Sequence, residues 1–466
     1  MRKVFLSLFL LLHLLTAAAA SPFSHGRLLV SPDGRFLQYA DGKPFFWLAD
    51  TGWLLPERLN RDEAAYYLRR CAEAGYNVVQ VQVVNAMPAF NVYGQMALAN
   101  GFDFSQADRP GVYGYWNHMD YIVDEAARQG IYVGMVCIWG SLVKKGLMNE
   151  EQARQYGSFL AQRYKKKPNI VWILGGDIEG DVHPEVWNAL GTAIKQADKN
   201  HLMTYHPRGR TCSARWWNNA TWLDFNMFQS GHRRYGQKTS PAPYPIPENT
   251  EEDNWQYVDS AWSYKPLRPV IDGEPSYEGI PKGLHDANEP LWTAREVRRY
   301  AYWSVFAGAC GHTYGHNNIM QFAKPGTPGA YFADGDSKPW YRAMDDEGFN
   351  QMRHLKDLML RLPYFDRVPD QSVIRHNGTR YERLAATRGK DYLLVYNYTG
   401  REMTIDLNVI SGREKQVWWM DAASGKLTLI GRYPSRVTTF RWHAAPGCAT
   451  DGVLIAIDST KDYLTD

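Results

Sequence analysis

The chain alternates between short, almost continuously apolar segments and longer segments in which apolar residues recur every three or four positions. Segments of the first kind, bounded by Gly, Pro, Asn or Asp, are typical of buried parallel strands. They predict eight strands, at residues 45–50, 77–84, 131–139, 169–176, 202–206, 224–229, 269–273 and 311–314. Segments of the second kind predict amphipathic helices at 61–74, 116–129, 149–164, 184–199, 251–264, 293–307 and 344–362. This alternation predicts an α/β fold in which a parallel sheet closes into a (β/α)8 TIM barrel.

A different pattern begins at about residue 370. Short alternating segments at 381–387, 392–396, 403–407, 416–420, 426–430, 437–442 and 452–457 are separated by Gly-containing turns, without helical stretches between them. Such spacing predicts a small antiparallel β-sandwich. The predicted organisation is therefore a signal peptide at 1–20, a (β/α)8 catalytic domain at 21–369 and a C-terminal sandwich domain at 370–466.

The N-terminus has the pattern of a secretory signal. Met1-Arg2-Lys3 is followed by an apolar run over 4–15 and by four alanines that end at Ala20. A basic start, an apolar core and a small-residue site predict cleavage after Ala20 and a secreted or periplasmic protein. The apolar run approaches spanning length, so an uncleaved anchor stays a minor alternative. No later segment is apolar enough to span a bilayer, and we expect no membrane association after cleavage.

Composition narrows the range of partners. The net charge is +3, from 52 basic and 49 acidic residues that are well interspersed, so the sequence indicates no nucleic-acid partner and favours a neutral or modestly charged one. The five cysteines, at positions 71, 137, 212, 310 and 448, are far apart and contain no CxxC, which favours neither a disulfide framework nor a zinc site. Whether any pair forms a disulfide stays open. We expect no cofactor and a monomer.

Two predicted strands end in carboxylates. Asp177 follows Gly175-Gly176 at the end of one strand, and Glu274 follows Gly273 at the end of another. Acids at the carboxyl ends of barrel strands face the catalytic side, and cleavage of an acetal requires one protonated and one ionised carboxyl group. We predict Asp177 as general acid and base and Glu274 as nucleophile, with the glycines allowing close approach of a ligand. Glu179, Asp181 and Asp272 are nearby competitors.

Other polar and aromatic residues follow the same strand ends, as a hydroxyl-rich ligand requires. The predicted substrate-binding residues are Asp50, Trp53, Gln82, Asn85, Trp139, His206, Gln229, His312, Tyr314 and His316. An aromatic content of 14% supplies stacking surfaces for sugar rings, although most of these side chains are expected to fill the core. Long segments at 87–115, 230–250 and 317–336 are predicted to build the substrate site.

Other chemistries are disfavoured. His312 and His316 have a spacing that suits two metal ligands, but they lie on a strand-to-loop passage and no HExxH accompanies them. No GxSxG elbow and no glycine-rich phosphate loop occurs. We therefore predict no metal site.

The chain resembles the apiosidase-like glycoside hydrolases of family 140. The resemblance is carried by Ala49-Asp50-Thr51-Gly52-Trp53, Trp172-Ile173-Leu174-Gly175-Gly176-Asp177, Asp272-Gly273-Glu274-Pro275 and Gly311-His312-Thr313-Tyr314-Gly315. It covers nearly the whole mature chain, including a C-terminal sandwich of the type labelled collagen-binding.

The resemblance implies a (β/α)8 barrel, catalysis by Asp177 and Glu274, and a secreted exo-acting enzyme. It implies that the partner is a plant cell-wall oligosaccharide or polysaccharide, with apiose of rhamnogalacturonan II in pectin as the leading candidate substrate. Two alternatives stay open: a glycosidase of another plant-sugar specificity, such as an arabinofuranosidase or an endoglucanase-like enzyme, and a non-catalytic carbohydrate- or collagen-binding surface protein.

Overall fold

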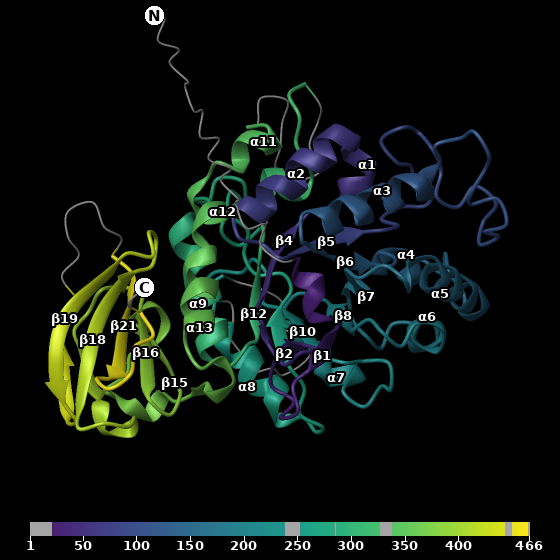
Figure 1. Cartoon of the computed structure of the whole chain (residues 1–466). Coiled ribbons are helices and arrows are strands. Elements are labelled where there is room, and N and C mark those ends of the chain that lie inside the picture. Colours follow the sequence, from purple (N-terminus) through teal and green to yellow (C-terminus); the bar gives the residue numbers. More distant parts are fainter. Residues whose placement is uncertain (1–20, 238–251, 285, 327–337, 443–449, 465–466) are drawn as a thin grey trace, which may run out of the picture.

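A parallel sheet of eight strands forms the centre of the larger part of the molecule (Figure 1). The computed structural model describes residues 21–464 except 238–251, 285, 327–337 and 443–449. The barrel strands are β4 (Trp47–Thr51), β5 (Val78–Gln82), β6 (Tyr132–Val136), β7 (Ile170–Ile178), β8 (Met203–Pro207), β10 (Asn226–Gln229), β11 (Val270–Asp272) and β12 (Gly311–Tyr314). Each lies where the sequence predicts a strand, so the predicted barrel is confirmed.

The sheet runs in the order β8-β7-β6-β5-β4-β12-β11-β10, with the two-residue β9 (Thr211–Cys212) antiparallel to β10. β8 and β10 meet where the ring closes. The backbone N–H of Asp224 donates to the carbonyl of Met203 at 2.9 Å, and the Thr204 hydroxyl donates to the carbonyl of Phe225 at 2.7 Å. All eight carboxyl ends therefore open on one face, where a barrel enzyme carries its site.

Helices form the layer around this sheet (Figure 1). The longer ones are α2 (Arg61–Glu73), α3 (Tyr115–Arg128), α5 (Glu150–Tyr164), α6 (Pro184–Ala197), α8 (Trp255–Ser263), α9 (Ala294–Phe306) and α13 (Arg353–Arg361). The shorter ones are α1 (Leu55–Arg58), α4 (Gly140–Lys144), α7 (Ala214–Trp217), α10 (Asn317–Met320), α11 (Trp340–Ala343) and α12 (Glu347–Gln351). The predicted helix at 344–362 is thus two helices, α12 and α13, which meet at Met352.

Side chains at the helix starts explain where several helices begin. The Asn60 carboxamide accepts the backbone N–H of Glu63 at 3.0 Å, and the Glu63 carboxylate accepts the backbone N–H of Asn60 at 2.9 Å. This reciprocal pair satisfies two N–H groups that the first turn of α2 cannot pair internally. The same arrangement opens α5 at Asn149, and at the start of α9 the Glu296 carboxylate accepts the backbone N–H of Thr293 at 2.9 Å.

A small antiparallel sheet leads into the barrel, and a β-sandwich follows it. The lead consists of β1 (Leu28–Val30), β2 (Leu37–Tyr39) and β3 (Pro44–Phe45). One sandwich sheet has the order β13 (Val368–Pro369), β15 (Leu384–Arg388), β16 (Tyr392–Asn397), β21 (Gly452–Asp458), β18 (Glu414–Asp421) and β19 (Leu427–Pro434). The other has the order β14 (Ile374–Arg375), β17 (Met403–Asp406) and β20 (Val437–Phe440).

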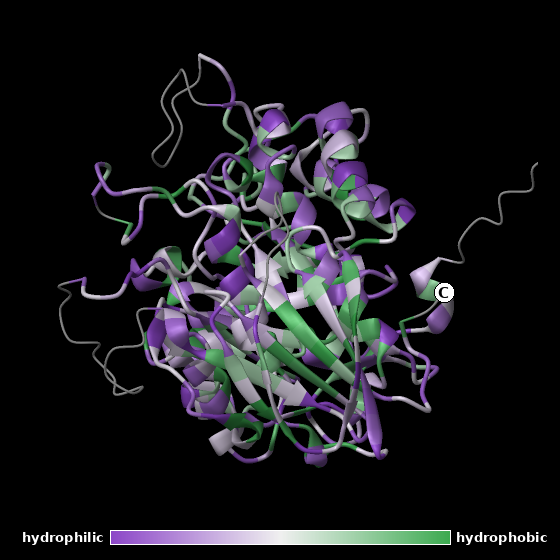
Figure 2. Cartoon of the chain, turned by 90° about the vertical axis from the view of Figure 1, so that its left-hand side faces the viewer, coloured by the Kyte–Doolittle hydropathy of each residue, from purple (hydrophilic) through white to green (hydrophobic). Residues whose placement is uncertain are grey.

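The predicted sandwich is therefore present. Apolar residues run along the central strands of its larger sheet (Figure 2), and Leu393, Val417 and Leu454 are fully buried in the core beside Ile405 of the smaller sheet.

The sandwich is joined to the barrel by buried polar contacts through α9. The Arg298 guanidinium forms an ion pair with Asp451 at 2.6 Å, with 4% and 0% of the two side chains exposed. The Tyr396 hydroxyl donates to the same carboxylate at 2.9 Å, and the Tyr396 ring stacks on Tyr302 with centroids 4.5 Å apart. Buried charge pairs of this kind favour one fixed arrangement of the two parts.

No helix among the described residues is long and apolar enough to cross a membrane. The predicted signal peptide at 1–20 lies outside the described residues, and the domain boundaries stay predictions. Cys71, Cys137, Cys212 and Cys310 are buried and free, whereas Cys448 lies outside the described residues.

Candidate active site

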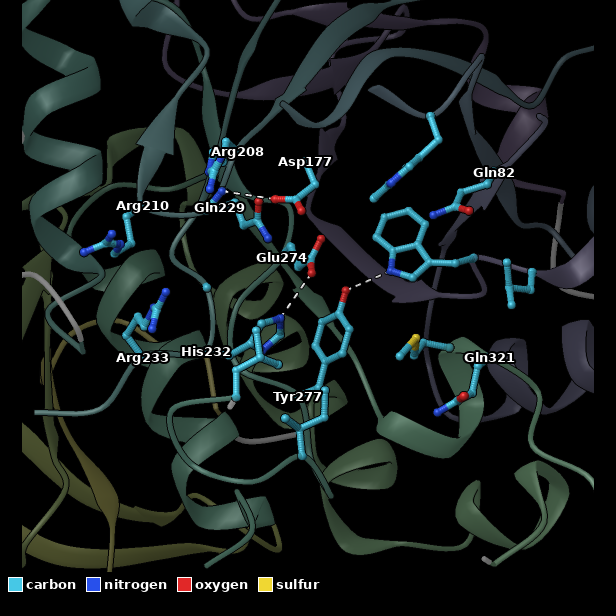
Figure 3. Close-up of a pocket in the computed structure, with 18 residues that line it drawn as sticks. Gln82, Asp177, Arg208, Arg210, Gln229, His232, Arg233, Glu274, Tyr277 and Gln321 are labelled. Atoms are coloured by element: carbon cyan, nitrogen blue, oxygen red, sulfur yellow. Dashed lines mark hydrogen bonds and ion pairs between the residues drawn. The ribbon is translucent and has the colours of Figure 1, made fainter. Parts of the chain in front are cut away.

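A pocket of about 550 Å³ opens at the carboxyl ends of the barrel strands (Figure 3). Its walls come from the ends of β4 to β8 and β10 to β11 and from the segment after β12. The lining residues are Trp53, Leu54, Gln82, Trp139, Asp177, Arg208, Gly209, Arg210, Gln229, Gly231, His232, Arg233, Glu274, Tyr277, Ile280, Leu284, Met320 and Gln321. Among these lining residues the only carboxylic acids are Asp177 and Glu274.

The backbone at the end of β7 places Asp177. Gly175, Gly176 and Asp177 all have positive φ, at 82°, 107° and 52°. The pairing with β8 shifts register between Gly175 and Ile178, so Asp177 leaves the regular pleat of the strand. Positive φ is uncommon for a residue with a side chain and is tolerated where the surroundings determine it. The result is a carboxylate that projects into the pocket and stays in contact with solvent.

The glycines beside the two acids serve close packing within the protein, which corrects the expectation that they admit a ligand. A Cβ at Gly175 would lie 2.3 Å from the carbonyl oxygen of His206, and one at Gly273 would lie 2.3 Å from the Met227 sulfur. A side chain at either position requires the neighbouring strand to move. These glycines therefore hold the strand ends, and the acids on them, in place.

Two histidines surround Glu274, which is 8% exposed. The Nε2 atom of His232 lies 3.1 Å from Oε1 of Glu274, and Nε2 of His206 lies 3.2 Å from Oε2. Burial alone would raise the pKa of Glu274, but the contacts with these two imidazoles outweigh it and lower the pKa to about 2. Glu274 is therefore ionised throughout the ordinary pH range.

His206 joins the two acids. The backbone N–H of Asp177 donates to Nδ1 of His206 at 3.3 Å, which leaves the ring proton on Nε2, the atom that faces Glu274. The ring itself packs against Trp53 and Trp139, with centroids 5.7 and 6.0 Å away. His206 is fully buried and thus fixes the position of Glu274 from behind the pocket.

Asp177 has the opposite electrostatic environment. Crowding by protein atoms, followed by the negative charge of Glu274, raises its pKa to about 6, while His206, the Gly209 N–H and Arg208 limit the rise. The Gly209 N–H donates to Oδ1 of Asp177 at 3.4 Å. The carboxylate nevertheless keeps access to water.

One pocket thus holds a carboxyl group whose pKa is raised and another whose pKa is lowered. Two carboxyl groups with divergent pKa values are the arrangement in which one donates a proton while the other remains charged. The geometry therefore suits hydrolysis of a glycosidic bond, with Asp177 as the protonated carboxyl group and Glu274 as the ionised one.

Several predicted binding residues line this pocket. Trp53, Gln82, Trp139 and Gln229 do so directly, and His206 lies immediately behind Glu274. The Trp53 indole N–H donates to the Tyr277 hydroxyl at 3.0 Å, which fixes both rings on one wall. The half-buried Trp139 ring can stack on a sugar, while Gln82 and Gln229 can contact its hydroxyls.

Five predicted binding residues are not brought to the pocket, and we correct those predictions. Asp50, His312 and Tyr314 are fully buried on β4 and β12 and cannot touch a ligand. Asp50 accepts the Tyr67 hydroxyl at 2.5 Å, and Tyr314 donates to Glu278 at 2.6 Å. Burial lowers the pKa of His312 to about 3.

The other two residues have local structural roles. Nδ1 of His316 accepts the backbone N–H of Asn318 at the start of α10, and its Nε2 lies 3.0 Å from Asp346. The Asn85 carboxamide donates to Glu57 at 2.9 Å. Asn85 and His316, a few residues beyond the ends of β5 and β12, therefore hold neighbouring segments in place.

The competing acids also lie elsewhere. Glu179 forms an ion pair with Arg208 at 2.9 Å and does not line the pocket. Asp272 is fully buried and accepts the Ser230 hydroxyl at 2.6 Å, so it supports the turn that leads to His232. Neither it nor Asp181 lines the pocket.

The long segments contribute unequally. The predicted site loops at 230–250 and 317–336 supply lining residues from their described parts, but 87–115 supplies none, which corrects that expectation. The remainder of those two loops, at 238–250 and 327–336, lies outside the described residues. Within the described parts of the chain, no group of three or more His, Cys, Asp or Glu side chains could hold a metal ion.

Some pocket residues were not predicted from the sequence. These are Arg208, Arg210, His232, Arg233, Tyr277 and Gln321. Each lies one to seven residues beyond a strand end, outside the terminal positions that the strand pattern singles out. They could have been predicted by also considering the polar and aromatic residues in the first few positions beyond each strand end.

Comparison with known families decides the assignment. Residues 31–366 match the family model described as "Apiosidase-like, catalytic domain". The chain belongs to the apiosidase-like family. Residues 368–457 match a second model, "Putative collagen-binding domain of a collagenase", which covers the sandwich.

Two solved structures extend the likeness to nearly the whole length. One, named "Glycoside hydrolase", is 60% identical, with a TM-score of 0.92, and the match covers 95% of this chain and 99% of that one. The other, a glycoside hydrolase family 5 protein from Bacteroides vulgatus, is 59% identical, with a TM-score of 0.93, and the match covers 95% of this chain and 96% of that one. This apiosidase-like protein is therefore a glycoside hydrolase.

Proposed function

We propose that the protein is a secreted, exo-acting glycosidase of family 140 that removes a side-chain sugar from plant pectin. The observation that carries the proposal is the pairing in one pocket of Asp177, whose pKa is raised to about 6, with Glu274, whose pKa is lowered to about 2. A pocket of about 550 Å³ is in the range that encloses a small ligand, which favours terminal over internal cleavage.

The leading candidate substrate is apiose in rhamnogalacturonan II. The match of residues 31–366 to the apiosidase-like model supports it, and the half-buried Trp139 ring supplies a stacking surface for a sugar. In the proposed retaining mechanism, Asp177 protonates the departing oxygen while Glu274 attacks the anomeric carbon. Asp177 then removes a proton from a water molecule whose oxygen attacks the anomeric carbon, which breaks the bond to Glu274 and releases the sugar.

Incubation with rhamnogalacturonan II fragments tests this proposal. We expect release of free apiose, measured by chromatography, and a first-formed product of unchanged anomeric configuration, measured by proton NMR. Asp177→Asn and Glu274→Gln should each lower kcat/KM by about 10²-fold or more. Release of arabinose or glucose instead would reassign the specificity, and full activity of either variant would reject the mechanism. Loss of activity in Glu179→Gln, with Asp177→Asn active, would move the acid to Glu179.

A further inference from the structure

A buried ion pair adjoins the loop that carries His232. The Arg299 guanidinium of α9 contacts the Glu252 carboxylate at 2.5 Å, and 0% of either side chain is exposed. Glu252 also accepts the backbone N–H of Tyr235 at 2.8 Å. Tyr235 is three residues beyond His232, whose Nε2 faces Glu274 (Figure 3). The pair therefore holds the far end of the segment that contacts the proposed nucleophile.

The sandwich domain completes this contact. Tyr381 lies in the short 3-10 helix η4 (Arg380–Glu382), within the residues that match the collagen-binding model. Its hydroxyl donates at 2.8 Å to Oε1 of Glu252, the same oxygen that accepts the Tyr235 N–H. Its ring packs edge-on against the Tyr235 ring, with centroids 5.1 Å apart. One sandwich side chain thus contacts both the buried carboxylate and the loop.

Sandwich rings also enclose the guanidinium of the pair. Cζ of Arg299 lies 4.9 Å from the ring centroid of Tyr381 and 5.0 Å from that of Tyr398. Two barrel rings, Tyr300 and Trp303, lie at 5.1 and 5.0 Å. Attraction between opposite charges is strong where water is excluded. Because two of these four rings belong to the sandwich, the strength of the ion pair depends on the sandwich as well as on the barrel.

The barrel fixes the same loop at His232 itself. The backbone N–H of Gly283 donates to the carbonyl of His232 at 2.9 Å, and the Tyr277 ring packs against the imidazole with centroids 4.8 Å apart. In the part of the chain that the structure describes, Nδ1 of His232 has no hydrogen-bond partner. The direction of the imidazole therefore depends on ring packing and on the course of the main chain, which the contact at Tyr235 helps to set.

We infer that the sandwich domain is part of the catalytic unit and that Tyr381 is a positioning residue for His232. Without the Tyr381 hydroxyl, the Glu252 carboxylate loses one of the contacts that fix it. The loop at Tyr235 is then less constrained, and His232 faces Glu274 in a smaller fraction of the molecules. The inference rests on glycoside hydrolase activity and goes beyond the proposed function, since it gives the sandwich a role in the reaction itself.

Removal of one hydroxyl tests the inference in the full-length enzyme. Tyr381→Phe keeps the ring, and the side chain is 40% exposed, so the change is compatible with folding. We expect kcat on rhamnogalacturonan II fragments to fall roughly 3- to 10-fold, as the loss of one hydrogen bond predicts, with KM changed by less than about 2-fold. Unchanged kcat, or a rise in KM alone, would overturn the inference.

A matched control separates positioning from a general effect on the sandwich. The Tyr463 hydroxyl donates to Asp391 at 2.8 Å, the same distance as in the Tyr381 contact, and joins two parts of the sandwich. Tyr463→Phe should therefore leave kcat unchanged. Equal falls in kcat for Tyr463→Phe and Tyr381→Phe would show that the effect is structural and reject the positioning role.

A double substitution tests whether the effect passes through His232. In the His232→Ala enzyme, the further change Tyr381→Phe should lower kcat by less than about 2-fold, because residues that act through one contact are not additive. The full 3- to 10-fold loss in that background would reject the path through His232.

Hydrogen exchange measured by mass spectrometry separates this inference from the proposed function, because it needs no substrate. Amides in residues 231–237 should exchange faster in Tyr381→Phe than in the unaltered enzyme, and at the unaltered rate in Tyr463→Phe. Faster exchange without hydrolysis of any pectic fragment would support the contact of Tyr381 with the loop and reject the proposed substrate. Unchanged exchange would reject the role of Tyr381 and leave the proposed function intact.

Discussion

Nε2 of His232 lies 3.1 Å from Oε1 of Glu274, at the end of a loop whose turn is supported by the buried Asp272. Glu274 accepts this contact because an ionised carboxylate has no proton to give, so His232 is the donor. The charge of the proposed nucleophile is thus maintained by a residue from the neighbouring β10 loop. A substitution in that loop should therefore change the pKa of Glu274.

Substitution of His232 should change the acidic side of the pH profile. In His232→Ala the pKa of Glu274 should rise from its value of about 2, because one of the two stabilising imidazoles is removed. The acidic limb of kcat/KM should then move to higher pH, which a pH titration of initial rates measures. His232→Gln retains an N–H donor and should move the limb less. An unchanged limb in His232→Ala would show that His206 alone maintains the charge.

The alkaline limb should report Asp177. Its pKa of about 6 means that the protonated form declines as pH rises through 6, and kcat/KM should decline with it. Arg208 lowers this pKa by its positive charge, so Arg208→Gln should move the alkaline limb to higher pH. The measurement is kcat/KM from pH 4 to 9. An alkaline limb well above pH 8 in the unaltered enzyme would contradict the assignment of Asp177.

Asp50 should make stability depend on pH. Burial raises its pKa to about 7 in the folded protein, against the Tyr67 hydrogen bond, while the ordinary value is 3.8. The folded state therefore favours the protonated form of Asp50. The resulting contribution to the free energy of unfolding is complete below about pH 4 and is lost as pH rises through 7. Asp50→Asn should show a smaller fall in Tm between pH 5 and 8, by scanning calorimetry. Asp62→Asn, at an exposed site on α2, is the control. Parallel curves for Asp50→Asn and the unaltered enzyme would disprove the effect.

The junction of barrel and sandwich should depend on one ion pair. Asp451→Asn leaves the Arg298 guanidinium, which is 4% exposed, without its carboxylate. We expect a loss of about 3 to 5 kcal/mol in the free energy of unfolding, measured by denaturant titration. Glu414→Gln breaks the exposed pair with Arg432 on the same sandwich and should cost about 1 kcal/mol or less. Similar losses in the two variants would show that the junction is held mainly by packing.

The sequence pattern was sufficient for the barrel because each strand is buried on both faces. A run such as Ile170 to Leu174 is then apolar at every position and ends at a glycine, which makes the strand end visible. Asp177 and Glu274 follow such ends directly, so strand order alone places them on one face. The start of a helix could also be predicted where the sequence contains a capping side chain, as at Asn60 before α2.

The binding residues were harder to predict because a strand end does not reveal the direction of its side chain. Asp50 and Trp53 are three residues apart, yet Asp50 points to Tyr67 within the core and Trp53 lines the pocket. Arg210 and His232 enter from turns whose shape depends on β9 and on Asp272, contacts between distant parts of the chain. Helical or strand periodicity contains no information on such contacts.

The three consecutive left-handed residues at the end of β7 have a consequence for how this enzyme could diversify. Because the main chain itself aims Asp177, the reactive centre can stay constant while lining residues such as Arg210, Arg233 and Gln321 change around it. A combinatorial library confined to those three codons would therefore explore new substrates without first having to rebuild catalysis.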